Sequence, residues 1–218
     1  MATATAPAVR PHSQAKLVFF IAYFTLTVFA VYYKNARVFD PTSPIAQHFA
    51  PVKWYLAVHG SCAAIATLVA AFQFSNRLRA RYLEMHRVLG YLYVTSVFVA
   101  CPFAVLISGK IALSTTQFAL DCTLSIAWAT TTLIALYCVR SGNVVQHRRW
   151  MIRSYPWAMT FTFNRIISVL LPSTRFGHSG FEAKIWMSAV LAAFLPTIFL
   201  EWRAIFSRST ARLGAMRE

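Results

Sequence analysis

The chain consists of long apolar runs separated by short polar clusters that are rich in arginine. An α-helix rises about 1.5 Å per residue, so roughly 20 apolar residues cross a hydrocarbon layer about 30 Å thick. The pattern therefore predicts an all-α fold, a polytopic transmembrane bundle of six helices. The predicted spans are Leu17–Tyr33, Trp54–Phe74, Val88–Ser108, Phe118–Val139, Tyr155–Leu171 and Ile185–Phe206.

The first and fifth spans have ambiguous beginnings. The first follows a basic start, and its residues 28–30 also fit a signal-peptide cleavage site. We interpret it as a helix, and its removal would leave the orientation of the other five unchanged. The fifth is short, and we expect it to begin nearer Val145. The arginines that then reach back to the inner surface are Arg148, Arg149 and Arg153.

The composition supports a membrane protein with a single domain over residues 1–218. Hydrophobic residues make up 58% of the chain and charged residues only 12%, whereas soluble domains are nearer half apolar and a quarter charged. The apolar runs also follow one another too closely for a second, soluble core. We expect a four-helix core at about 54–171, with flanking helices at 17–33 and 185–206.

Basic residues are concentrated in alternate polar segments of the chain. If the N-terminus is cytoplasmic, 14 of the 21 lysines and arginines fall in inner segments, which predicts that both termini are inside (N-in/C-in). The net charge of +15 does not indicate nucleic acid, because these residues flank apolar spans and no soluble basic domain is present. Anionic lipid headgroups account for the charge. We expect a multi-pass protein of the bacterial cytoplasmic (inner) membrane, with lipids as partners.

Two inner turns each end in a His-Arg pair that opens a span. His86-Arg87 opens the third span and His147-Arg148 opens the fifth, and these two helices run in the same direction. The positive end of a helix macrodipole keeps imidazole neutral, which is the form that binds haem iron. If the helices are neighbours or diagonal, the histidines could ligate one haem b from opposite sides, or contribute to a metal site. Alternatively, both are interfacial side chains bonded to lipid phosphate or backbone.

Arginines accompany both histidines, and a third histidine lies in the other leaflet. Three arginines could hold haem propionates or could only set the topology: Arg87, Arg148 and Arg149. His59 lies roughly 7.5 Å along the second span from its outer end, beside Gly60, which would let a helix or a flat cofactor approach. His59 could contribute to cofactor binding or could bond across helices. His178, in the outer loop, could reach the same leaflet or could be solvated.

Asp121 and Arg165 are charged residues within the predicted fourth and fifth spans. Both fall in the outer leaflet, where a lone charge in hydrocarbon costs several kcal/mol, so we expect them to pair inside the bundle. The pair could fix the register of two helices, or it could line a proton or substrate path.

Three sequence strings resemble a bacterial family of predicted multi-pass membrane proteins of unknown function (DUF2306). They are His59-Gly60, the string from His86-Arg87 to Tyr93, and His147-Arg148-Arg149-Trp150-Met151-Ile152-Arg153-Ser154. The resemblance covers roughly Trp54 to Leu171 and implies no activity. The four-helix core with histidines at helix ends is also similar in architecture to b-type membrane cytochromes. Cytochromes with two haems carry one histidine pair in each leaflet, and here only the inner pair is evident.

Two functions of different classes remain open. The first is haem-binding electron transfer near the cytoplasmic face, with His86 and His147 as axial ligands and a quinone or a redox protein as partner. The second is a small transporter or lipid-binding protein without a redox cofactor, in which Asp121 and Arg165 line an outward cavity. A metal-dependent membrane enzyme is disfavoured, because the six histidines are spread over both sides of the membrane. The protease and hydrolase motifs HExxH and GxSxG are absent.

Overall fold

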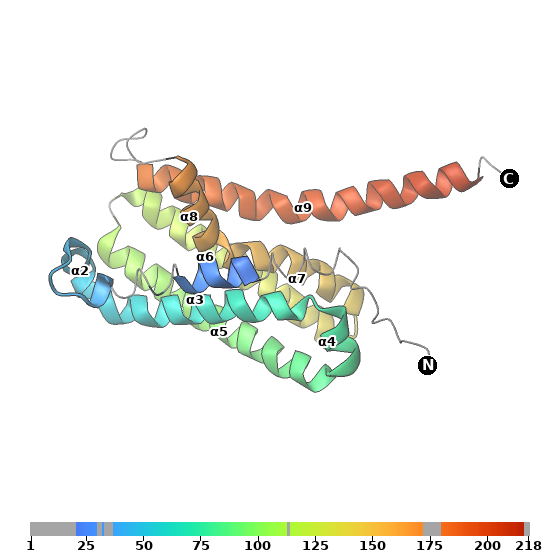
Figure 1. Ribbon diagram of the computed structural model, residues 1–218, viewed down its shortest axis with the longest axis horizontal. Coiled ribbons are helices and arrows are strands. Elements are labelled where there is room, and N and C mark those ends of the chain that lie inside the picture. The colour runs from blue at the N-terminus through green and yellow to red at the C-terminus, as the bar shows by residue number, and fades with distance from the viewer. Residues whose placement is uncertain (1–20, 30–31, 33–36, 113, 172–179, 216–218) are drawn as a thin grey trace, which may run out of the picture.

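The computed structural model describes residues 21–29, 32, 37–112, 114–171 and 180–215. Every regular element in these ranges is a helix, which confirms the predicted all-α class (Figure 1). A helical segment covers residues 21–29. The later elements are α2 (Pro44–Phe49), the 3-10 turn η1 (Ala50–Val52), α3 (Lys53–Gln73), α4 (Asn76–Arg81), α5 (Leu83–Ile111), α6 (Thr115–Arg140), α7 (Val144–Ala158), α8 (Thr160–Leu170) and α9 (Gly180–Ala215).

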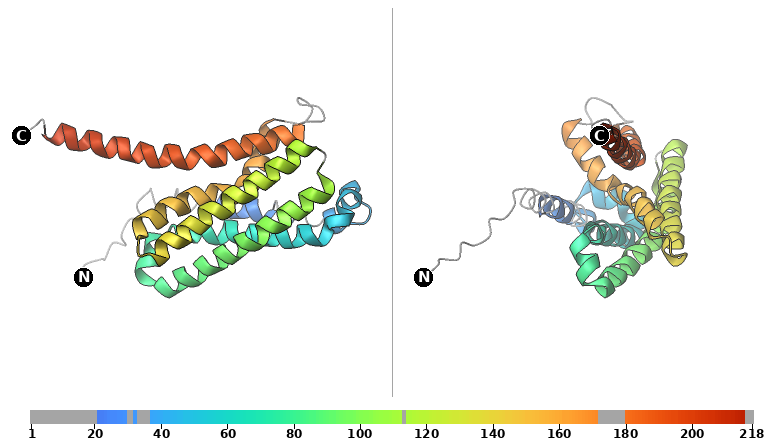
Figure 2. Two further views of the ribbon diagram at one scale, coloured as in Figure 1. Left: turned by 180° about the vertical axis from the view of Figure 1, so that it is seen from behind. Right: turned by 90° about the vertical axis from the view of Figure 1, so that its right-hand side faces the viewer.

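The helices α3, α5, α6 and α7 form a four-helix core (Figure 2). Packing is most extensive between α3 and α5, then between α6 and α7 and between α5 and α6, whereas α3 and α7 touch only slightly. Since α5 packs on α3 and α6, and α7 packs on α6 and slightly on α3, the helices α5 and α7 lie diagonally opposite each other in the core. Short turns join consecutive helices, so α5 and α7 run in the same direction and α6 runs between them in the opposite one. The long helix α9 packs on α7 and α8 and extends past the core (Figure 1).

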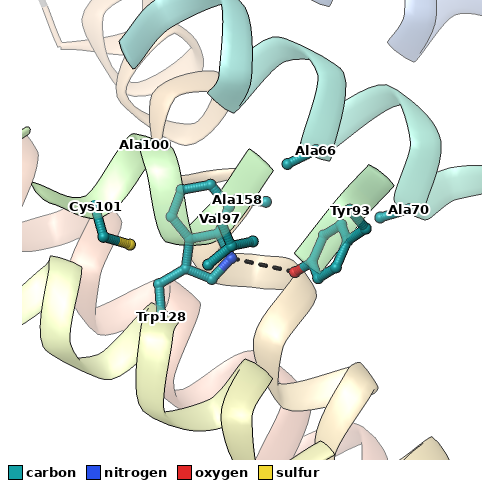
Figure 3. Packing of buried hydrophobic residues seen from close by; sticks show 8 residues of the cluster. All are labelled: Ala66, Ala70, Tyr93, Val97, Ala100, Cys101, Trp128 and Ala158. Carbon is teal, nitrogen blue, oxygen red and sulfur yellow. Dashed lines mark hydrogen bonds between the residues drawn. The ribbon is translucent and has the colours of Figure 1, made fainter. Parts of the chain in front are cut away.

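Small side chains allow these helices to approach closely. Ala66 and Ala70 of α3 meet Val97 and Ala100 of α5 with no exposed surface (Figure 3). Without a hydrophobic force between helices in lipid, close packing of small residues and interhelical hydrogen bonds hold such a bundle together. Large apolar side chains instead point outward, where lipid can cover them. Examples are Phe98, Leu106, Ile126, Leu133 and Phe194.

A closed ring of hydrogen bonds joins α5, α6 and α7 inside the core. The Trp128 indole donates to the Tyr93 hydroxyl over 3.1 Å (Figure 3), and the Thr132 hydroxyl donates to the Trp128 carbonyl over 2.8 Å. Each hydroxyl has one proton to donate, and that of Thr132 is used in this bond, so the direction of the other two bonds is fixed. Tyr93 donates to Ser154 over 2.6 Å, and Ser154 donates to Thr132 over 2.7 Å. The ring satisfies all four buried side chains, as a dry interior requires.

Within the described part of the chain, four helices are long and apolar enough to span a membrane: Ala46–Gln73, Leu83–Ile111, Thr115–Arg140 and Gly180–Trp202. They match the second, third, fourth and sixth predicted spans. The fifth appears as α7 and α8, which are separated at Met159, and α7 begins at Val144, close to the predicted Val145. Arginines in α7 lower its hydropathy. The first span lies partly outside the described residues. The count of six spans and the N-in/C-in topology therefore remain predictions.

Candidate functional site

His86 and His147 occupy equivalent places at one end of the core. Each is the fourth residue of its helix, α5 or α7. The backbone N–H of His86 donates to the Tyr82 carbonyl and that of His147 to the Asn143 carbonyl, both over 3.0 Å. The Asn143 side chain caps α7 by accepting the Gln146 N–H over 3.1 Å. Both imidazoles therefore project from the first turn of co-directional helices.

The hydrogen-bonded ring shows which faces of α5 and α7 are turned toward each other. Tyr93 lies seven residues after His86, and Ser154 lies seven residues after His147. Seven residues make almost two turns, so each histidine shares a helix face with its partner about 10.5 Å further along the axis. Tyr93 and Ser154 meet across the diagonal at 2.6 Å. The faces that carry His86 and His147 are therefore turned toward each other at one level.

The two imidazoles have nitrogens available for a ligand. Nδ1 of His147 donates to the Ala135 carbonyl over 2.8 Å, which fixes the tautomer and leaves a lone pair on Nε2. Nδ1 of His86 is buried and has no hydrogen-bond partner. His86 also lies within electrostatic range of His147 and of Arg79.

Gly90 lies one turn after His86 and faces the side chain of Gln73 on α3. A Cβ atom placed at Gly90 would meet only Oε1 of Gln73, at 4.0 Å. Gln73 is itself buried, and its Nε2 has no partner. Buried polar groups without a partner are uncommon, so the Gln73 amide and Nδ1 of His86 are two groups that a ligand could satisfy.

Positive charge surrounds the histidine end of the core. The pKa of Arg79 is lowered, because its guanidinium is partly buried and because the charge of Arg148 is close. Arg87, Arg148 and Arg149 are exposed. None of these four arginines forms an ion pair with a residue in the described ranges. The cluster can therefore receive an anionic group.

His59 and Asp121 lie at the other end of the core, on the walls of two adjoining cavities of about 240 Å³ and 500 Å³. Nδ1 of His59 donates to the Ala100 carbonyl over 2.9 Å, which ties α3 to α5. One oxygen of Asp121 accepts the Ser108 hydroxyl over 2.7 Å, which ties α5 to α6. Both residues thus have one structural hydrogen bond and further polar atoms at a cavity.

Asp121 and Arg165 line the smaller cavity together but form no ion pair with each other. The Arg165 guanidinium lies over the Phe161 ring, 4.8 Å from its centroid, and its buried Nε has no hydrogen-bond partner. Asp121 is held by Ser108 instead. The two charges are thus available to a third group.

The sequence predicted no role for four residues that the structure connects with the histidine pair or with Asp121: Tyr93, Ser154, Gly90 and Ser108. The first two could have been found from their equal spacing from the two histidines. His178 lies outside the described residues. Among the described residues, no group of three or more histidine, cysteine or acidic side chains could hold a metal ion.

Comparison with known proteins places the chain in a family. The model of a family described as "Predicted membrane protein (DUF2306)" matches residues 56–205, from α3 into α9. This range contains His59, Asp121, Arg165, His86 and His147, and it extends beyond Leu171, where the sequence resemblance ended. No curated protein and no solved structure matches the chain. The match covers more than half of the chain, so this protein belongs to that family of multi-pass integral membrane proteins.

Proposed function

We propose that the protein binds one haem b between α5 and α7, with His86 and His147 as axial ligands, and that it carries electrons. The proposal depends on one observation above all: the Tyr93–Ser154 bond places the two histidine faces opposite each other on helices that run in the same direction. Two imidazoles on diagonal helices at one level are the donor set that a bis-histidine haem needs.

The surroundings of the two histidines support this assignment. The hydrogen bond from His147 to a backbone carbonyl is the usual support of a ligating imidazole, because it orients the ring and raises its basicity. Gly90 has no side chain one turn after His86, so a flat group there would have to displace only the Gln73 side chain. The arginine cluster of Arg79, Arg148 and their neighbours offers partners to propionates.

A haem with two protein ligands supplies one-electron transfer, since no iron position is left for substrate. The chain's own residues would hold it, neutralise its propionates and exclude water through the apolar core. With the N-in/C-in orientation, the site lies near the cytoplasmic face of a bacterial inner membrane. A quinone or a redox protein would exchange the electron.

The test is the absorption spectrum of the full chain, purified in detergent from haem-sufficient cells. We expect a Soret band at about one haem per chain. His86→Ala and His147→Ala should each lower bound haem by more than about tenfold, because changes to the supporting shell alone cost that much. The matched control is His48→Ala, an exposed histidine on α2. A preparation without a Soret band, or a band that survives both substitutions, rules the proposal out.

A second substitution tests whether the haem lies beside Gly90 and does not change either proposed histidine ligand. Gly90→Leu should place a bulky side chain one turn from His86 and reduce haem content. Gly109→Leu on the same helix is the control, because a Cβ there makes only an ordinary 3.7 Å contact with Phe118. Equal haem content in the Gly90 and Gly109 variants would show that the cofactor does not lie beside Gly90.

A second candidate function, a binding or transport cavity, is supported at the opposite end of the core. Its observation is that Asp121 and Arg165 line one cavity without pairing. The sequence left open whether these two residues form a structural ion pair or line a cavity, and their position on a cavity wall supports the second hypothesis. It does not exclude haem binding, because the two sites share no residue.

A further inference from the structure

The two outer cavities have the size and walls of a small-molecule site. They share His59 and Asp121, and their volumes, about 240 Å³ and 500 Å³, fall near the range of ligand pockets. Small residues of three helices leave this space open, and aromatic rings close it toward α8 and α9. The shared apolar walls are Ala63, Ala104, Ala158, Phe161, Phe181 and Ile185.

The two polar side chains that both cavities share, His59 and Asp121, can accept hydrogen bonds from a ligand. A carbonyl can only accept, so the bond to Ala100 requires the proton of His59 to be on Nδ1, which leaves Nε2 as an acceptor. One oxygen of Asp121 is occupied by Ser108, and the other is open to a further donor. A ligand group that binds to these two atoms must therefore donate hydrogen bonds, whereas Arg165, on the wall of the smaller cavity only, can donate to an acceptor of the ligand.

The walls of the two cavities restrict which donor groups a ligand can carry. A lone ammonium group would have to leave water for a largely apolar cavity that already contains the Arg165 guanidinium, which costs far more than moving a hydroxyl. The indole rings of Trp128 and Trp157 and the Phe161 ring line the smaller cavity and suit a flat aromatic body. Hydroxyl groups on a flat, apolar ring satisfy both requirements.

We propose that these cavities bind a hydroquinone, a ring with two hydroxyl groups, whose hydroxyls donate to Asp121 and to Nε2 of His59. This inference deepens the second candidate function by naming its ligand class. Binding does not require haem, whereas use of the ligand as an electron source rests on the proposed haem function. Trp128, on the cavity wall, donates to Tyr93, so the ring of hydrogen bonds lies between the two sites.

The experiment compares two probes on the full chain purified in detergent under anaerobic conditions. The probes are decylubiquinol and its dimethyl ether, in which both hydroxyls are capped, and quenching of tryptophan fluorescence reports binding. We expect saturable binding of the quinol and at least about tenfold weaker binding of the ether, the effect of losing one hydrogen bond to a charged acceptor. Equal binding of the two probes would overturn the proposal.

Two substitutions assign the binding to this place. Asp121→Asn removes the charge but can keep the bond to Ser108, and it should weaken quinol binding by about tenfold. Its control is Thr123→Ala, an exposed position on the same helix. Ala104→Phe should block the cavity, while Leu106→Phe, on the exposed face of α5, should not. Circular dichroism identifies any variant that fails to fold, and the Ala104 and Asp121 variants test the site independently.

Failure of this inference is distinguishable from failure of the haem proposal. His86→Ala should lose the Soret band and keep quinol binding. Asp121→Asn should keep the Soret band and weaken quinol binding. Quinol binding that both cavity variants leave unchanged would overturn the assignment. So would dioleoyl phosphatidylethanolamine in mixed micelles if it displaced the quinol at equal mole fraction, because a zwitterionic lipid would then be the better ligand.

Discussion

At the residue scale, a single spacing connects structure and candidate chemistry. His86 and Tyr93 are seven residues apart, as are His147 and Ser154, and the two distal residues share a proton-ordered ring with Trp128. The ring joins three helices through side chains that have no exposed surface or almost none. Because the interior is dry, each lost partner leaves an unsatisfied polar atom.

Ser154→Ala should therefore destabilise the protein by about 1–3 kcal/mol, since Tyr93 loses its acceptor and Thr132 loses its donor. The measurement is the shift of the thermal or denaturant midpoint in detergent. Ser141→Ala is the control, because this exposed serine lies in the turn after α6. A change no larger than that of the control would mean that the ring contributes little to stability.

At the element scale, α7 combines a polar start with an apolar continuation. Its N-cap is Asn143, its first turn contains His147, and its arginines keep it from resembling an ordinary span. The residues that follow Met159 form α8, which carries Arg165 to the outer cavity. One discontinuous helical run thus reaches both candidate sites.

Asn143→Ala should cost about 1 kcal/mol, because the Gln146 N–H loses its only side-chain acceptor at the start of α7. Asn143→Asp should restore the loss, since a carboxylate accepts the same bond and suits the positive helix end. Unfolding midpoints of the three proteins in one detergent decide the matter. Equal loss in both variants would indicate that the cap is not what the asparagine provides.

At the scale of the whole molecule, the distribution of charge predicts the orientation in the membrane. The histidine end of the core carries the arginine-rich turns, including the α4 segment and the start of α7. The cavity end carries few basic residues. Cytoplasmic retention of positive segments therefore predicts that the histidine end faces inward and the cavity end outward.

Reporter fusions in a bacterial host test this orientation. A green fluorescent protein fused after Glu218 should fluoresce, because it folds only inside the cell. An alkaline phosphatase fused after Ala112, in the turn between α5 and α6, should be active, because it requires the periplasm. The opposite result at both positions would invert the topology and place the histidines at the outer face.

The sequence by itself determined the membrane class, the all-α fold, the position of four spans and the placement of both inner histidines in first helical turns. These follow from local properties: hydropathy over about 20 residues, and the charge of the turns. Only the tertiary structure decided which faces meet. That Tyr93 reaches Ser154, that Asp121 is held by Ser108 rather than Arg165, and that Gly90 opens toward Gln73 all depend on helix rotation. Rotation is fixed by close packing between segments distant in sequence, and no local pattern encodes it.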